Sequence, residues 1–228
     1  MRKNAAAAVL VCIAVFLAGC SADMNSTESD EDFKGAETTV QTNPNDAEPY
    51  TIDTKISDVI NDPAFEDYGR LIFPVNSGYY SGDTLGELEL TWYNNIAPDK
   101  TVEIANYMKS RAENGDIIFY DIYTDEEKAA DPAKEDTGLF FFKGNPGERF
   151  AVCSAGGGFA YVGAMHDSFP HALELSKMGY NAFALIYRPG AQTACEDLAR
   201  AISFIFENAD ELAVNTDCYS LWGGSAGG

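Results

Sequence analysis

Apolar residues in the second half of the chain form short runs of strand length, separated by segments with helical periodicity. The runs that predict buried strands are 117–123, 138–142, 150–154, 182–187 and 218–222. Helices are predicted at 171–178 and, from apolar positions spaced i, i+3, i+4, i+7 and i+8, at Leu198, Ala201, Ile202, Ile205 and Phe206. Because strands and helices alternate from 150 to 222, we predict an α/β fold with a mostly parallel sheet flanked by helices.

The first 19 residues have a different pattern, typical of a secretory signal. A basic start at Arg2 and Lys3 precedes an apolar run at 5–18, whose helix of about 21 Å is shorter than a ~30 Å hydrocarbon core. The run ends in the sequence LAGC, which resembles the bacterial lipobox. The resemblance implies that residues 1–19 are removed and that a lipid on Cys20 anchors the protein outside the cytoplasm, at the bacterial cell membrane. An ordinary signal peptide with a chance cysteine is the alternative.

Composition divides the rest of the chain into three parts. Residues 20–48 contain eight acidic residues, one lysine and one aromatic. They bury too little apolar surface to offset the entropy of ordering, which predicts a disordered tether behind the lipidated cysteine. Residues 49–112 are globular in composition, with a strand-like piece at 88–92 and a helix near 102–112, but they contain no chemical motif and their role is unclear. Residues 113–228 hold the regular alternation.

Charge and cysteine usage exclude several classes of function. The chain has 15 Lys and Arg against 36 Asp and Glu, a formal charge of −21, and loss of residues 1–19 leaves 13 against 36, or −23. Such a field repels phosphate backbones, so we exclude general nucleic-acid binding. Cys153 and Cys218 fall in apolar runs, where we expect both to be buried as small hydrophobes. The cysteine spacing fits neither a disulfide framework nor a zinc site.

The chain ends in a Gly-x-Ser-x-Gly pattern made by Gly223, Ser225 and Gly227, directly after a predicted strand. A nucleophilic serine on a sharp strand-to-helix turn has strained backbone angles. The residues two before and two after it crowd the turn, which explains why both are glycine. Ser225 is therefore the candidate nucleophile.

A second glycine cluster, Gly156-Gly157-Gly158, also follows a predicted strand directly. Successive glycines let backbone N–H groups point at one acceptor, as is needed to hold the negative oxygen formed in acyl transfer. A nucleotide loop is disfavoured, because Gly-x-Gly-x-x-Gly would require glycine at Tyr161, and the P-loop lysine is missing. A flexible glycine turn without chemistry is the simpler alternative.

Together the two clusters resemble the α/β-hydrolase superfamily, especially its bacterial esterase and lipase branch related to hormone-sensitive lipase. The sequence AGGGF at 155–159 stands where that branch has HGGGF. IYRPG at 186–190 is similar to its DYRLAP segment, and GGSAGG at 223–228 is similar to its GDSAGG elbow. The resemblance covers roughly residues 117–228, about half of the chain.

The resemblance implies a role for each matching residue. Ser225 is the nucleophile, and the oxyanion hole is formed by the N–H groups of Gly157, Gly158 and Ala226. The supporting glycines are Gly156, Gly223 and Gly227, and the candidate pocket-lining side chains are Phe159 and His166. Ala155 replaces the family histidine, whose structural role in the loop must be absent or supplied elsewhere. Gly224 replaces an aspartate, a change that elbows in related branches tolerate.

The family order places the acid and the histidine of the triad after the serine, and nothing follows Gly228 in this sequence. His166 and His171 both precede Ser225, and we expect neither to be the base. We therefore expect the N-terminal half of an α/β-hydrolase domain, inactive by itself, with the C-terminal strands and roughly 70–100 residues missing.

These expectations combine into one hypothesis for the full-length protein. It is a serine ester hydrolase that acts on a small-molecule or acylated-sugar ester through an acyl-enzyme on Ser225, is attached to the membrane through Cys20, and needs no metal or organic cofactor. A serine peptidase on the same fold is one alternative. A non-catalytic surface lipoprotein that uses the fold as a binding module is another.

Overall fold

The computed structural model describes residues 48–93 and 97–228. The predicted signal peptide, Cys20 and nearly all of the acidic tether lie outside the described residues. The described residues form one compact unit. Within the described part of the chain, every helix is too short or too polar to span a bilayer.

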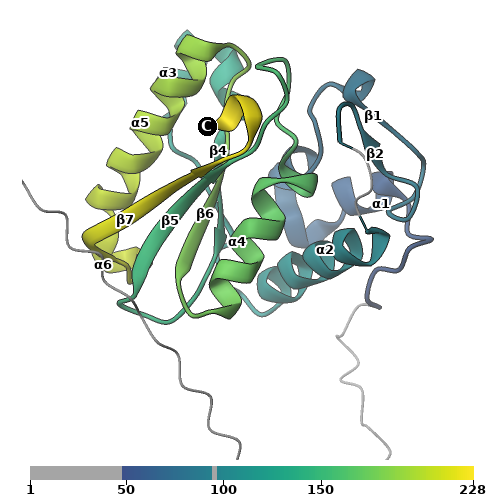
Figure 1. Ribbon diagram of the computed structural model, residues 1–228, viewed down its shortest axis with the longest axis horizontal. Coiled ribbons are helices and arrows are strands. Elements are labelled where there is room, and N and C mark those ends of the chain that lie inside the picture. Colours follow the sequence, from purple (N-terminus) through teal and green to yellow (C-terminus); the bar gives the residue numbers. More distant parts are fainter. Residues whose placement is uncertain (1–47, 94–96) are drawn as a thin grey trace, which may run out of the picture. The chain divides into compact units, whose positions relative to one another are not determined.

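The unit contains a five-stranded sheet, a two-stranded sheet and helices on both faces of the larger sheet (Figure 1). Its strands are β1 (Tyr80–Ser81), β2 (Glu89–Leu90), β3 (Phe119–Tyr120), β4 (Gly138–Phe142), β5 (Arg149–Ser154), β6 (Asn181–Ile186) and β7 (Asn215–Gly223). Its α-helices are α1 (Ile56–Ile60), α2 (Pro98–Glu113), α3 (Asp125–Ala130), α4 (Ser168–Lys177), α5 (Ala191–Glu207) and α6 (Ala209–Leu212). The 3-10 turns are η1 (Pro63–Leu71), η2 (Ser77–Tyr79), η3 (Pro132–Asp136), η4 (Ala164–His166) and η5 (Ser225–Gly227).

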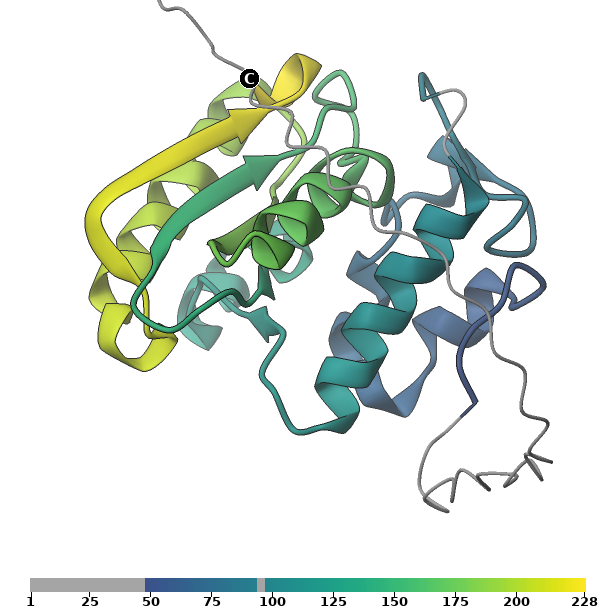
Figure 2. The ribbon, with the colours of Figure 1, turned by 60° about the horizontal axis from the view of Figure 1, so that its bottom comes forward.

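The larger sheet has the strand order β3-β4-β6-β5-β7. β5 pairs in parallel with β6 and with β7, whereas β4 is antiparallel to both of its neighbours. Four of the five strands therefore point the same way. Helices α4 and α5 connect the parallel strands and lie on opposite faces of the sheet (Figures 1 and 2). The predicted α/β fold, a mostly parallel sheet flanked by helices, is confirmed.

The central strands are apolar on both faces because each face is covered by a helix. Phe140 and Phe142 of β4 meet Phe169 of α4, with ring centroids 5.0 and 5.6 Å apart. Phe141, which points the other way, stacks on Phe183 of β6 at 4.4 Å. Full burial of each such ring stabilises the fold by about 1.5–3 kcal/mol. Because both faces of β4 are buried, its sequence at 138–142 is apolar throughout.

The N-terminal part of the unit differs from the sequence prediction in detail. Only Phe119–Tyr120 of the predicted strand at 117–123 pairs in the sheet. The strand-like piece at 88–92 contributes β2, which pairs with β1 in the separate two-stranded sheet. Helix α2 begins at Pro98, four residues before the predicted start, because proline is well tolerated in the first turn of a helix.

The expectation that Cys218 is buried is wrong. β7 pairs with β5 on one side and with no other described strand, so it forms the edge of the sheet, and Cys218 is exposed. Leu221 and Trp222 on the same strand are also exposed. Cys153 on β5 is buried as predicted, and its burial raises the pKa of the thiol to about 12.

Candidate active site

Ser225 lies on a sharp turn at the carboxyl end of β7. Its φ is 50°, a left-handed value that is uncommon for a residue with a side chain and is found at functional sites. A Cβ on Gly223 would lie 2.2 Å from the backbone oxygen of Gly227, and one on Gly227 would lie 2.2 Å from that of Ser154. Both glycines are therefore required by close backbone approach, and Ser225 itself is exposed.

The second glycine cluster forms a tight loop at the carboxyl end of β5. Gly157 and Gly158 have φ values of 143° and 61°. The loop is closed by N–H groups of later residues, since Gly163 donates to the oxygen of Gly156 at 2.9 Å and Ala160 to that of Gly157 at 3.0 Å. In the described part of the chain, the N–H groups of Gly157 and Gly158 donate to no other residue, which leaves them free for an external acceptor.

The fold brings the two glycine turns together. β5 and β7 are parallel neighbours, so their carboxyl ends meet at one edge of the sheet. The N–H of Gly224 donates to the oxygen of Ser154 at 3.3 Å. A Cβ built on Gly156 would lie 3.0 Å from the Cβ of Ser225. Ala226 follows in the turn η5. The serine and the predicted oxyanion residues thus share one site, although their roles stay predictions.

Asp167, which the sequence analysis did not single out, holds this site together. Its side chain is buried, and its Oδ2 accepts the N–H of Gly156 at 2.8 Å and the hydroxyl of Tyr93 at 2.8 Å. Hydrogen bonds to a charged group are each worth about 1.5–3 kcal/mol. Asp167 therefore fixes the glycine loop at a position where Ala155 has no polar side chain to do so.

Asp167 also explains glycine at position 224. A Cβ on Gly224 would lie 2.3 Å from the Oδ2 of Asp167, so the carboxylate fills the space that a side chain at 224 would take. The two departures from the family motif, Ala155 and Gly224, are thus linked through one carboxylate from a third segment. The sequence carries no spacing signal for this link, because Asp167 lies 11 residues from Gly156 along the chain.

Tyr93 connects the segment at 49–112 to the site. Besides its bond to Asp167, its ring lies against the loop, and a Cβ on Gly163 would be 2.6 Å from the Cε2 atom of the ring. Burial and the bond to Asp167 raise the pKa of the Tyr93 hydroxyl above its ordinary value. The hydroxyl therefore stays a proton donor to the carboxylate, and the N-terminal segment takes part in the support of the glycine loop.

The turn after β6 holds the loop from the other side. The hydroxyl of Tyr187 donates to the oxygen of Ala155 at 2.6 Å, and the N–H of Gly190 donates to the oxygen of Phe159 at 2.9 Å. Burial raises the pKa of Tyr187 to about 12, which keeps the hydroxyl protonated. Both ends of the glycine loop are therefore bonded to the four residues that follow β6.

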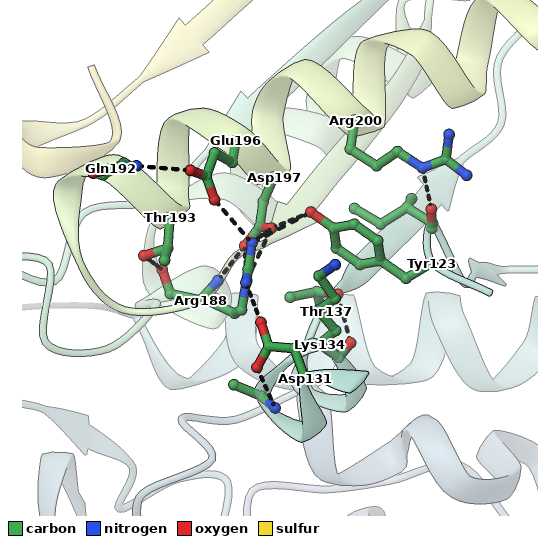
Figure 3. A network of polar contacts seen from close by, with 12 residues as sticks. Tyr123, Asp131, Lys134, Thr137, Arg188, Gln192, Thr193, Glu196, Asp197 and Arg200 are labelled. Carbon is green, nitrogen blue, oxygen red and sulfur yellow. Dashed lines mark hydrogen bonds and ion pairs between the residues drawn. The ribbon is translucent and has the colours of Figure 1, made fainter. Parts of the chain in front are cut away.

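Arg188 fixes this turn to helix α5 (Figure 3). The arginine is buried and its Nη2 lies 2.7 Å from Oδ1 of Asp197, which is fully buried. Asp197 also accepts the N–H of Arg188 and the hydroxyl of Tyr123, and Nη1 of Arg188 lies 2.6 Å from Asp131. Removal of one member of a buried ion pair costs about 3–5 kcal/mol, so the turn is held rigidly.

The two histidines do not complete a triad with Ser225. Both ring nitrogens of His166 are buried and have no hydrogen-bond partner among the described residues. Nδ1 of His171 lies 2.8 Å from the backbone oxygen of Asp167, and its ring lies 6.2 Å from that of Trp222. Neither histidine forms a hydrogen bond with Ser225.

Ser225 lines neither of two cavities found among the described residues. The larger, of about 990 Å³, lies between η1, the end of α2, β3 and α3, away from both glycine turns. A smaller one of about 230 Å³ lies along β5 and β7. Phe159, a predicted lining residue, is 39% exposed. Within residues 48–93 and 97–228, no cluster of three or more His, Cys, Asp or Glu side chains could hold a metal ion.

We expect Gly224→Asp to destabilise the fold through Asp167. Gly224→Ala should cost about 1–3 kcal/mol of unfolding free energy by overpacking, and Gly224→Asp should cost more because two carboxylates then share one space. In an Asp167→Ala background the aspartate at 224 should cost at least about 1 kcal/mol less. Urea unfolding of the four variants measures this coupling, and strictly additive losses would contradict it.

We expect His166 to make stability fall with acid. Burial lowers its pKa to about 4 from an ordinary value of 6.5, so the unfolded chain binds a proton more readily than the folded one. Stability is then full above pH 6.5 and is lost towards pH 4, by about 3 kcal/mol. His166→Phe should lack this component. Urea unfolding from pH 7 to pH 4 tests it, and a pH-independent difference between wild type and variant would rule it out.

Comparison with known proteins gives partial structural similarity only. No protein-family profile matches the chain, and no curated protein matches it. The apo form of Thermogutta terrifontis esterase 2 is 26% identical, with 40% of this chain and 38% of that chain covered and a TM-score of 0.37. The native structure of a thermophilic esterase from the same Planctomycetes species is 28% identical, with 40% and 36% covered and a TM-score of 0.36. An α/β hydrolase from a Medee basin deep-sea metagenome library is 23% identical, with 37% and 40% covered and a TM-score of 0.32. The chain spans about two fifths of the length of these structures.

Proposed function

We propose that the complete protein is a serine hydrolase of the α/β-hydrolase type that cleaves carboxylic esters. The observation that carries the proposal is the strained, exposed Ser225, with a φ of 50°, beside the glycine loop that follows the neighbouring parallel strand β5 and carries free N–H groups at Gly157 and Gly158. Strain of this kind has a cost of about 1–3 kcal/mol and persists where the surroundings impose it. A strained backbone at an exposed serine is more typical of a nucleophile than of an ordinary turn.

The chemistry assigned to these residues is acyl transfer. The Oγ of Ser225 attacks the ester carbonyl, and the alcohol leaves as the acyl-serine forms. The N–H groups of Gly157, Gly158 and Ala226 hold the negative oxygen of the tetrahedral intermediate. Water then attacks the acyl-serine and releases the acid. Because the acid and base of this fold follow the serine along the chain, the proposal assigns neither role to His166 or His171.

The proposed substrate class follows from the net charge of the chain. A chain with a formal charge of −21 disfavours anionic substrates, so the proposal favours neutral small-molecule esters, acylated sugars included. A serine peptidase on the same fold would use the same residues. A binding module without catalysis would keep the fold and lose the reactivity of Ser225, which separates it from both hydrolases.

Labelling with a fluorophosphonate probe tests the proposal on the complete protein. We expect covalent labelling of the protein at Ser225 and loss of this label in Ser225→Ala, because the attacking oxygen is gone. Ser220→Ala is the matched control, since Ser220 is an exposed serine on β7, the strand that leads to Ser225, and its loss should leave labelling unchanged. A complete, folded protein that takes up no label would favour the binding module. Hydrolysis of p-nitrophenyl acetate but not of the matched anilide separates esterase from peptidase.

We also propose that the mature protein is anchored outside the cytoplasm through a lipid on Cys20. The support is the sequence LAGC after a short apolar run, followed by an acidic segment. Cys20→Ala should move the protein from the membrane fraction to the soluble fraction, because the thiol that carries the lipid is lost. Cys195→Ala, at an exposed cysteine of the folded unit, is the control. Retention of the Cys20→Ala protein in the membrane would refute the anchor.

A further inference from the structure

Trp92 combines exposure with an imposed backbone conformation. Its side chain is 65% exposed although it is the largest apolar type, and its φ is 71°, a left-handed value that is a rare outlier for a bulky residue. Both neighbours are fixed. The N–H of Thr91 donates to the oxygen of Tyr79 at 2.9 Å, and that of Tyr93 donates to the oxygen of Leu90 at 3.0 Å. The chain is thus held so that the indole faces outward.

The indole lies directly against the oxyanion loop. A Cβ on Gly158 would be 2.9 Å from Cζ3 and 3.2 Å from Cη2 of Trp92, so the six-membered ring covers this glycine. Behind it, the ring of Tyr161 lies 5.8 Å away and is stacked on Tyr79 at 4.7 Å. The hydroxyl of Tyr161 donates to the oxygen of Thr91. The exposed indole is therefore supported from below by two stacked rings.

A carbonyl oxygen bound by the N–H of Gly158 places the rest of the ester beside this surface. The indole offers a flat, uncharged face, and pairs of aromatic rings attract each other more strongly than the area that they bury accounts for. Phe159, 39% exposed, follows Gly158 on the same loop. A flat aromatic substituent has a larger contact area with such a face than a short alkyl chain has.

We propose that Trp92 is a specificity-determining residue that binds the aromatic ring of an aryl ester. The proposal rests on the proposed function of Ser225 and adds the class of substrate. It also gives the segment at 49–112 a direct role, since Trp92 comes from that segment and Gly158 from the hydrolase-like half. Trp222 provides a matched control. It is the other tryptophan, 45% exposed on β7, and its Nε1 donates to Ser220.

Fluorescence tests ring binding without any hydrolysis. Trp92 and Trp222 are the two tryptophans of this sequence, so the difference in emission between Ser225→Ala and Ser225→Ala with Trp92→Phe isolates, in the complete protein, the response of Trp92. We expect phenyl acetate to change its emission in a saturable way and ethyl acetate to leave it unchanged. Ser225→Ala with Trp92→Phe, which keeps Trp222, should respond to neither ester. An unchanged emission of Trp92 with phenyl acetate would overturn the proposal.

Kinetics on the complete protein separates failure of the subsite from failure of the proposed function. Trp92→Ala should lower the kcat/KM ratio of phenyl to ethyl acetate about tenfold, mainly through KM, whereas Trp222→Ala should keep it. If Trp92→Ala hydrolyses both esters with an unchanged kcat/KM ratio, the proposed ring site is wrong and the proposed hydrolase function stands. A saturable Trp92 response in a protein without hydrolysis overturns the hydrolase and leaves the ring site. A sugar acetate that equals phenyl acetate in both assays overturns the assignment to aryl esters.

Discussion

The close approach of two backbone turns at one edge of the sheet is the constraint on which the candidate site depends. β5 and β7 are parallel neighbours, so their carboxyl ends deliver the loop at 156–158 and the turn at Ser225 to the same place. The turns fit only because no Cβ stands between them, as the contacts of Gly156, Gly223 and Gly227 show. Glycine at these positions is therefore a condition of the geometry that the serine adopts.

Three segments far apart in the sequence hold the glycine loop in that geometry. Asp167 bonds to the N–H of Gly156, Tyr93 bonds to Asp167, and Tyr187 bonds to the oxygen of Ala155. The buried pair of Arg188 and Asp197 then ties the turn after β6 to helix α5. A loop with free N–H groups is preorganised for an anion only if it is kept from turning them inward, and these bonds supply that restraint.

The sequence predicted the strands that are apolar on both faces and the helices between them, because a strand buried on both faces leaves a continuous apolar run and a helix buried on one face leaves a periodic one. It also located both glycine turns, since Gly-x-Ser-x-Gly and the triple glycine reflect local backbone demands. It failed at Cys218, where an apolar run lies on an edge strand. Burial of Cys218 depends on which elements cover β7, and a run of apolar residues in the sequence does not specify those elements. It also gave no role to Tyr93 or Asp167, whose partners are 74 and 11 residues away.

The sequence by itself determined the fold class, the two turns and the acidic charge, because these follow from local patterns and composition. Only the tertiary structure decided that Asp167 fills the space left at Gly224, and that Trp92 covers Gly158. Such contacts join surfaces that meet only after the chain has folded. A carboxylate that fills the space beside Gly224 could come from any segment that reaches this space. The motif specified where the two glycine turns lie in the sequence, and packing between distant segments specified what surrounds them.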